Sequence, residues 1–429
     1  MGHYSVNVER PLTGRGADHP HICQYYYHII IIIILGISDV PTAFDVIKHE
    51  TIFNCLCDCG MPKTFVAWYM RELTSSKLHI KTRGFECEPI VQTRGIPQGS
   101  KWSPQLYKTV LAYILQPIWD QCQTQKLGIE LLDIYVPFMF FSDNMFILAP
   151  NAIDFEKILD WIRVALDGSG WHIPNDRVEF QPNKFVDETQ MHILDKYARK
   201  QLPDNFKCLG CLLNVKGTTG ADVQFKGILM ESALSMRSDL WQTKNVSRKN
   251  KLNLMFKVAS GALCWSVGAW TINQRLLSGM KRRFDTVAKR YQRLPRLTDE
   301  NDEDYSKRSN RLLAATKQKL KQANMDRAIL ARQYDYIGHV IRQTVRNPGC
   351  LLQHALDYKD KQWRLQHEQV LQFQGHQHRV PPWTWEYQFD SYFDKLKLFW
   401  RECAADRDTW QQHKKGWVEY RLGKRNHLG

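Results

Sequence analysis

Two aspartates, Asp39 and Asp143, stand where strand-like runs of the sequence end. Asp39 follows an isoleucine-rich run, and Asp143 lies between the apolar runs 135–141 and 145–148. Carboxylates at the ends of buried strands cost free energy unless they hold a cation. A pair of them brought together across a sheet is what two-metal phosphoryl transfer requires, because their oxygens bind Mg²⁺ ions. Taken alone, the pair carries little weight, since exposed aspartates are common in turns.

Four segments of the sequence, two of which contain Asp39 and Asp143, strengthen the case for the pair. They read DVPTAFD over Asp39–Asp45, RGIPQGS over Arg94–Ser100 with Ser103-Pro104 following, FSDN over Phe141–Asn144, and FKCLG over Phe206–Gly210. In order and spacing these segments resemble the metal-binding, nucleotide-binding, catalytic and primer-grip motifs of the reverse transcriptases of non-LTR (LINE-type) retrotransposons. The resemblance spans Ile37 to about Arg346, and the PQG segment is its most specific part.

The resemblance implies a role for each matching residue. Asp39, Asp143 and Asn144 occupy the catalytic positions, and Asp39, Asp143 and the backbone carbonyl of Val40 would bind a pair of Mg²⁺ ions. Phe44 stands where the family places a ring that excludes a 2′-hydroxyl and so selects deoxynucleotides.

The remaining motifs imply contacts with the nucleotide and the primer. Gln98 and Gly99 would lie against the incoming nucleotide and the template. Arg94 either faces phosphate or is a solvated turn residue. The primer-grip residues would be the three that match the family motif, namely Phe206, Leu209 and Gly210.

The sequence departs from the family at two places. Asn144 stands where the family has a second aspartate, so the catalytic box has one negative charge fewer and a weaker hold on divalent cations. Only 38 residues precede Asp39, where the family has its fingers, and no endonuclease segment is evident. We therefore expect a truncated and partly degenerate copy.

Charge and composition agree with an acidic partner. The 429 residues include 59 Lys and Arg against 44 Asp and Glu, a net charge of +15, which suits nucleic acid or an anionic membrane. With 43% hydrophobic residues the chain is neither fully disordered nor collagen-like. A strongly basic helix is expected to contact nucleic acid, although a solvated face is the alternative; its basic residues are Lys281, Arg282, Arg283, Lys289 and Arg290.

The apolar run from Tyr25 to Ile37 is too short to cross a bilayer, which takes about 20 residues. Its β-branched residues favour a buried strand, with a signal or anchor segment as the alternative. The 11 cysteines are too few for a disulfide scaffold, so reduced thiols in an intracellular chain are expected. Cys55, Cys57 and Cys59 would fan around a helix rather than form a metal site, and the CxxC of Cys208 and Cys211 has no second half at zinc spacing.

The predicted fold class is α+β: a right-hand polymerase palm with an antiparallel sheet and incomplete fingers, then a helical thumb and a basic helical region. The expected boundaries are 1–28 for a leader, 29–215 for the palm, 216–298 for the thumb-like part, and 299–429 for the Trp-rich remainder. Within the palm, turn signals predict two helices split at Gly60–Pro62, a hairpin with Gly84 near its tip, a Ser-capped helix over 103–119, a strand pair broken at 142–144, and a helix over 155–166.

These observations predict an RNA-directed DNA polymerase that binds an RNA template, a DNA primer and deoxynucleoside triphosphates, with Mg²⁺ as cofactor. The alternative is a catalytically inactive, nucleic-acid-binding remnant of such an element. No membrane partner is expected and no protein partner can be deduced. The sequence does not fix the localisation, for which the resemblance implies the nucleus.

Overall fold

The end of the isoleucine-rich run forms the central strand of a five-stranded sheet. Strand β1 (Ile34–Asp39) pairs antiparallel with β9 (Asn144–Ala149) on one side and β10 (Val178–Pro182) on the other. The outer strands are β8 (Phe138–Phe141) and β11 (Ala198–Arg199), giving the order β11-β10-β1-β9-β8. The predicted strand is confirmed from residue 34 to residue 37, and the earlier isoleucines lie outside the described residues.

The computed structural model describes residues 34–39, 44–79, 81–82, 84–86, 88–97, 99–182, 188–199, 205–214, 219–270, 272–292, 294–320, 324–358 and 385–423. For Asp39 and Phe206 only the backbone is described. Of the predicted site residues, Val40 and Gln98 lie outside these ranges.

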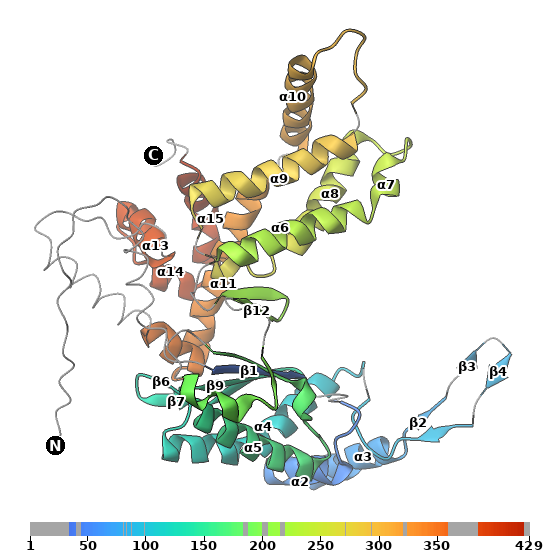
Figure 1. Ribbon diagram of the computed structural model, residues 1–429, viewed down its shortest axis with the longest axis vertical. Helices are drawn as coiled ribbons and strands as arrows, with labels where there is room; N and C mark the ends of the chain where they lie inside the picture. The colour runs from blue at the N-terminus through green and yellow to red at the C-terminus, as the bar shows by residue number, and fades with distance from the viewer. Residues whose placement is uncertain are drawn as a thin grey trace, which may run out of the picture.

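The sheet has helices on one face and a hairpin on the other (Figure 1). Residues 145, 147 and 149 of β9 are buried in a core with helices α4 (Ser103–Gln125) and α5 (Ala152–Ser169). Successive side chains of a strand point to opposite faces, so Phe146 and Leu148 face the other way. There they pack against Cys208 and Leu209, at the tip of a two-stranded hairpin formed by β12 (Asn205–Cys208) and β13 (Cys211–Asn214).

The turn signals in the palm are largely confirmed. Helices α2 (His49–Asp58) and α3 (Lys63–Thr74) are separated at Gly60, whose φ is +72°. The hairpin around Gly84 is formed by β2 (Lys77–Leu78), β3 (Lys81–Thr82), β4 (Phe85–Glu86) and β5 (Ile90–Val91), in which β2 pairs with β5 and β3 with β4. The structure also contains an unpredicted hairpin of β6 (Ile129–Leu131) and β7 (Ile134–Val136).

One detail of α4 is wrong in the prediction. Ser103 does not cap the helix: it is the first helical residue, and its hydroxyl donates a hydrogen bond to the carbonyl of Pro97 at 2.5 Å. The helix also continues past Pro117 to Gln125. Helix α5 extends beyond the predicted range 155–166 at both ends, from Ala152 to Ser169, and it stops before Gly170, which has a φ of +101°.

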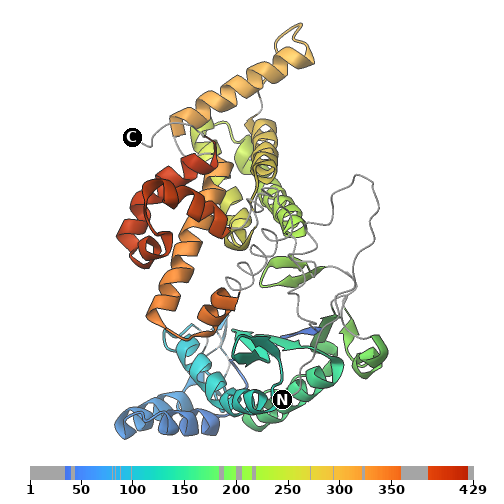
Figure 2. The ribbon, with the colours of Figure 1, turned by 90° about the vertical axis from the view of Figure 1, so that its left-hand side faces the viewer.

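The second half of the described chain is helical (Figure 2). Its helices are α6 (Gly220–Ser235), α7 (Ser238–Gln242), α8 (Arg248–Leu263), α9 (Gln274–Gln292), α10 (Asp302–Leu320), α11 (Met325–Arg346), a helix over 351–358, α13 (Trp385–Phe393), α14 (Trp400–Ala405) and α15 (Arg407–Arg421). Within the described ranges, no helix has both the length and the apolar character needed to span a membrane.

A single hydrophobic core runs through these helices, from Met230 to Val418. Three tryptophans of the C-terminal part, Trp400, Trp410 and Trp417, belong to it. Trp410 stacks on Tyr334 with ring centroids 4.0 Å apart, and each residue donates a side-chain hydrogen bond to the other's backbone carbonyl. Their role is therefore packing between α11 and the C-terminal helices.

Asp222, near the start of α6, joins the β12–β13 hairpin to this helical core. The side chain is 4% exposed and accepts three hydrogen bonds. The donors are the backbone N–H of Leu212 at 2.8 Å, the hydroxyl of Ser266 at 2.5 Å and the indole N–H of Trp270 at 2.7 Å. Trp270 continues the chain of contacts, because its carbonyl accepts a hydrogen bond from Gln333 of α11.

We predict that Asp222→Ala lowers the free energy of unfolding by about 3–5 kcal/mol, because it leaves buried donors without an acceptor. Urea denaturation followed by tryptophan fluorescence measures the loss. The control is Glu303→Ala, which removes an exposed ion pair with Lys307 and should cost less than about 1 kcal/mol. Equal losses in the two variants would contradict the role given to Asp222.

Candidate functional site

The register of the sheet brings two of the predicted catalytic positions together. Asp39, the last residue of β1, pairs directly with Asn144, the first residue of β9. Asp143 precedes Asn144 in the two-residue turn between β8 and β9. The backbone of Asp39 therefore lies beside the Asp143 turn at one end of the sheet, although the two residues are far apart in the sequence.

The Asp143 turn is held in an uncommon conformation. Ser142 has a positive φ of +55°, whereas Asp143 does not. This combination is typical of a type II′ turn, in which the first central residue is usually glycine. The carbonyl of Ser142 accepts a hydrogen bond from the hydroxyl of Tyr107 at 3.0 Å. Burial raises the pKa of Tyr107, and the nearby carboxylate of Asp143 raises it further, so its hydroxyl stays protonated and able to donate.

Asn144 interacts directly with the carboxylate of Asp143, the predicted catalytic residue. Its side-chain amide donates a hydrogen bond to Oδ1 of Asp143 at 3.2 Å. A carboxylate at this position could not donate in this way and would add a second negative charge. The substitution therefore neutralises part of the site and engages one oxygen of Asp143.

Phe44 connects the first motif to this turn. Its ring stacks on Tyr107 with centroids 4.6 Å apart and an interplanar angle of 26°. Its carbonyl accepts a hydrogen bond from the N–H of Ile96 at 2.7 Å, and the N–H of Gly95 donates to Ile47 at 2.8 Å. The segment that begins the PQG motif therefore runs beside the segment that follows Asp39.

Two glycines permit this close packing. Gly95 has a φ of +85°, and a Cβ there would lie 2.6 Å from the carbonyl oxygen of Asp45. Gly170, on the other side, leaves room for the carbonyl of Val46, which would be 2.5 Å from a Cβ. The backbone after Phe44 is thus held between two turns that only glycine fits.

The nucleotide-binding positions are described in part. Arg94 is exposed, and among the described residues its side chain has no hydrogen bond or ion pair. Gly99 is exposed with a φ of +91° and open space around its Cβ position, so its backbone conformation rather than crowding requires glycine. The roles predicted for Arg94 and Gly99, like those for Gln98 and Val40, stay predictions.

The predicted primer-grip residues form a hairpin. Phe206 pairs with Leu213, and Leu209 and Gly210 make the turn, with φ values of +48° and +76°. Both turn carbonyls are bound by the helical part: that of Leu209 accepts from the indole N–H of Trp265 at 2.7 Å, and that of Gly210 accepts from Nζ of Lys226 at 2.8 Å.

Trp265 contacts the predicted primer-grip turn and was not picked out from the sequence. Its indole is held by the Leu209 carbonyl, yet 63% of the residue is exposed. The tip of the hairpin that it contacts lies over Phe146, two residues beyond Asn144 and on the same face of β9. In the sequence Trp265 is one of 14 tryptophans, and its local sequence did not distinguish it from the others.

The five basic residues predicted to bind nucleic acid lie on α9, and they differ in their surroundings. Three have partners within the protein: Lys281 pairs with Asp326 at 3.7 Å, Arg283 with Glu231 at 3.0 Å, and Lys289 donates to Asn310 at 3.0 Å. Among the described residues, Arg282 and Arg290 have no such partner. Their guanidinium groups are available to an external anion.

The cysteines agree with reduced thiols. Every cysteine in the described ranges is free, with Cys55 buried and Cys57 and Cys59 exposed around α2 as predicted. Burial, and to a smaller extent Cys211, its partner across the hairpin, raise the pKa of Cys208 to about 11. Over the part of the chain that is described, no group of three or more potential metal-ligating side chains comes together, and the side chain of Asp39 is not in that part.

Comparison with known proteins now identifies the class. Residues 33–211 match the family model described as reverse transcriptase (RNA-dependent DNA polymerase). Those residues, which include β1 and reach the first residue of β13, are therefore similar to a reverse transcriptase domain, and their mixed helix and sheet architecture fits a palm-like polymerase fold.

The sequence relatives place this domain among non-LTR retrotransposons. It is 25% identical over 122 residues to the retrovirus-related Pol polyprotein from type-2 retrotransposable element R2DM of Drosophila melanogaster, covering 28% of this chain and 11% of that protein. It is 26% identical over 139 residues to the corresponding polyprotein from type-1 element R2 of Nasonia vitripennis, covering 32% and 13%. The matches thus span only about a tenth of these relatives' length.

Structural similarity is weaker. Apo telomerase from Candida tropicalis aligns with a TM-score of 0.38 at 8% identity, covering 76% of this chain and 53% of that one. The same telomerase in complex with a fragment of telomeric RNA gives 0.37 at 9% identity, covering 79% and 51%.

We predict that Tyr107→Phe loosens the catalytic turn without disturbing the stacking on Phe44. Loss of the hydroxyl should speed amide hydrogen exchange over residues 142–144 by about fivefold to tenfold, the equivalent of one hydrogen bond of about 1 kcal/mol. Tyr113→Phe is the matched control: it lies on the same helix, but its hydroxyl donates to Asp58. Unchanged exchange in Tyr107→Phe would show that the turn does not depend on this bond.

Proposed function

We propose that this chain carries an RNA-directed DNA polymerase that extends a DNA 3′-hydroxyl along an RNA template. The observation that carries the proposal is the pairing of Asp39 with Asn144, which puts the first motif and the catalytic turn at one sheet edge. In this proposal the sheet is the palm, the β12–β13 hairpin grips the primer, and α6–α9 serve as the thumb.

The residues at this edge fit a divalent metal in chemical type. Asp143 offers a half-buried carboxylate in a turn, and Asp39 stands on the neighbouring strand. Oxygen donors are the ligands that Mg²⁺ prefers. Two Mg²⁺ ions, held by Asp39, Asp143 and the carbonyl of Val40, would supply charge stabilisation at the attacking and leaving oxygens.

The chain's other residues would position the reactants. Tyr107 fixes the turn that presents Asp143 and also supports the ring of Phe44, which would pack against the sugar of the incoming nucleotide. Arg94 and the backbone of Gly99 would face its phosphates and the template, together with Gln98. Deoxynucleoside triphosphates are the proposed substrates.

A nucleic-acid-binding remnant without activity is the second candidate. It is favoured by the hydrogen bond from Asn144 to Asp143, which occupies one carboxylate oxygen and replaces a negative charge by a neutral amide. Binding of template and primer would then survive without synthesis.

Substitutions in the catalytic turn separate these candidates. Asn144→Asp should raise the rate of primer extension on a poly(rA) template by at least tenfold, because a second carboxylate strengthens divalent-cation binding. Asp143→Asn should abolish extension, lowering it by at least a hundredfold. The measurement is incorporation of labelled dTMP from an oligo(dT) primer with Mg²⁺ or Mn²⁺.

The control is Asp176→Asn, an exposed carboxylate in the short 3-10 helix over Asn175–Arg177. It should leave extension unchanged. Extension that persists in Asp143→Asn would refute the proposed active site. If neither the parent chain nor Asn144→Asp extends a primer that both bind, the binding remnant is the correct assignment.

Trp265 is the proposed stacking surface for the primer end. An exposed aromatic ring can stack on a nucleobase, which is worth about 1–3 kcal/mol. Trp265→Ala should therefore raise KM for the primer–template about tenfold with little change in kcat, while Trp265→Phe keeps most of the affinity. Fluorescence of 2-aminopurine at the primer 3′ end reports stacking without requiring synthesis.

Trp68→Ala, on α3, is the control for Trp265, since Trp68 is also exposed (45%) but lies on another element. Equal fluorescence quenching by the parent chain and Trp265→Ala would exclude the stacking role.

A further inference from the structure

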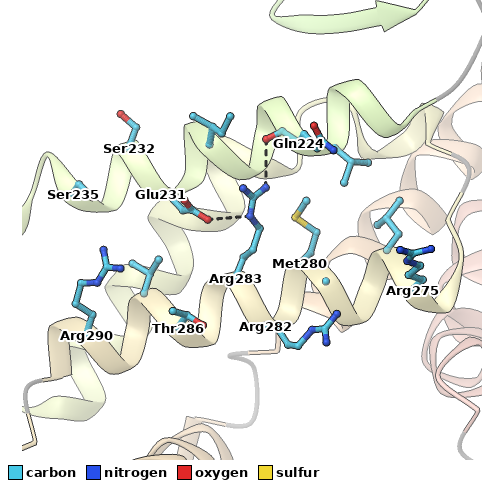
Figure 3. A pocket seen from close by; sticks show the side chains of 15 residues that line it. Gln224, Glu231, Ser232, Ser235, Arg275, Met280, Arg282, Arg283, Thr286 and Arg290 are labelled. Carbon is cyan, nitrogen blue, oxygen red and sulfur yellow. Dashed lines mark hydrogen bonds and ion pairs between the residues drawn. The ribbon is translucent and has the colours of Figure 1, made fainter.

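A groove with a volume of about 900 Å³ lies between α6 and α9 (Figure 3). Helix α9 lines one wall with Arg275, Arg282 and Arg290, and α6 lines the other with polar side chains that include Ser232 and Ser235. Arg275 was not among the basic residues picked out in the sequence, because it is separated from the Lys281–Arg283 cluster.

The three arginines form one stripe. They are seven and eight residues apart, which at 3.6 residues per turn places them within about 80° around the axis of α9 and spaces them about 10 and 12 Å along it. All three are exposed. Within the described ranges, none of their guanidinium groups has a hydrogen bond or an ion pair.

Unlike these three arginines, Arg283 has hydrogen-bond partners within the protein. It reaches across to α6, where Nε pairs with Glu231 at 3.0 Å and one terminal nitrogen donates to the carbonyl of Gln224 at 3.4 Å (Figure 3). Its guanidinium lies over Gly227, where any side chain would collide with it. Arg283 therefore holds the two walls together and also neutralises Glu231, the one acidic residue among those that line the groove.

The groove lies on the opposite side of α6 from the primer-grip hairpin. Asp222 and Lys226 of α6 bind that hairpin. Nine residues make two and a half turns of helix, so Glu231 lies opposite Asp222 and Ser235 lies opposite Lys226. A ligand in the groove would consequently not be in contact with the hairpin.

We propose that this groove binds the phosphate backbone of an RNA strand at a second site, separate from the palm and hairpin. Arginine forms paired hydrogen bonds with phosphate oxygens, and a row of regularly spaced guanidinium groups suits a polymer of phosphates rather than a single anion. The hydroxyls of Ser232 and Ser235 can add neutral donors. The choice of RNA over an acidic protein rests on the proposed function, in which the chain holds an RNA template.

The first test removes the three charges together. Arg275→Gln, Arg282→Gln and Arg290→Gln are combined in the full chain, and binding of an unprimed 30-nucleotide RNA is measured by fluorescence anisotropy at several salt concentrations. We expect affinity to fall by roughly tenfold to a hundredfold, and the slope of log K against log salt to fall by about 2, as three lost phosphate contacts on a single strand require.

The matched control removes the same charge elsewhere. Arg248→Gln, Arg311→Gln and Lys415→Gln change exposed residues outside the groove, and their combination should leave affinity and salt slope close to those of the parent chain. If the two triple variants bind RNA equally, the groove is not the site and the inference is overturned.

A second pair of variants tests the groove without touching an arginine. Gly279 lines it, and a Cβ there meets nothing within 4 Å. Gly279→Glu adds a carboxylate among the arginines and should weaken RNA binding about tenfold, whereas Gly279→Ala should not. Both residues favour a helix more than glycine does, so neither variant should unfold the chain. Equal binding by the two would count against the site.

Competition identifies the ligand. Single-stranded RNA is expected to displace the probe at least tenfold better than polyglutamate of equal charge, because the spacing of the arginines suits a chain of phosphates. DNA of the same sequence carries the same phosphates and is expected to compete within a few-fold of RNA. Equally effective polyglutamate would overturn the nucleic-acid assignment in favour of an acidic protein. None of these readouts needs synthesis, so a chain that fails primer extension but shows the groove-dependent binding would refute the proposed activity and leave the groove site standing.

Discussion

The buried carboxylate of Asp222 is the interaction on which the arrangement of the two halves depends. Three donors from the hairpin and from the segment after α8 converge on it. A buried charge is tolerated only when such partners satisfy it, and removal of one side leaves the other unpaired. These hydrogen bonds therefore attach the hairpin to the helices, although in the sequence it follows the strands of the sheet.

The catalytic edge depends on backbone packing rather than on charge. Gly95 and Gly170 hold the chain after Phe44 between two turns, and Tyr107 supports both Phe44 and the turn at Ser142. These contacts precede any ligand, so the geometry around Asp143 is set by the fold. Asn144 contributes a neutral amide there instead of a negative charge.

Much of this organisation was predictable from the sequence. Glycine and proline signals located α2, α3, the Gly84 hairpin and the end of α5, because their backbone requirements are local. The turn between β8 and β9 lies where the sequence predicted a break in the strand pair, at residues 142–144. The pairings that use Arg283 with Glu231, and Lys281 with Asp326, were not predictable, since they join helices whose relative positions the sequence does not encode locally. For the same reason the surroundings of Trp265 and Arg275 could not be predicted, because their neighbours come from other elements.

The turn of the β12–β13 hairpin makes two different kinds of contact, one with the helices and one with the sheet. Trp265 and Lys226 bind its carbonyls through directional hydrogen bonds, whereas its contact with Phe146 and Leu148 is apolar and has no preferred direction. The direction of the turn is therefore fixed by the helical part, while its apolar contact with β9 imposes no direction of its own.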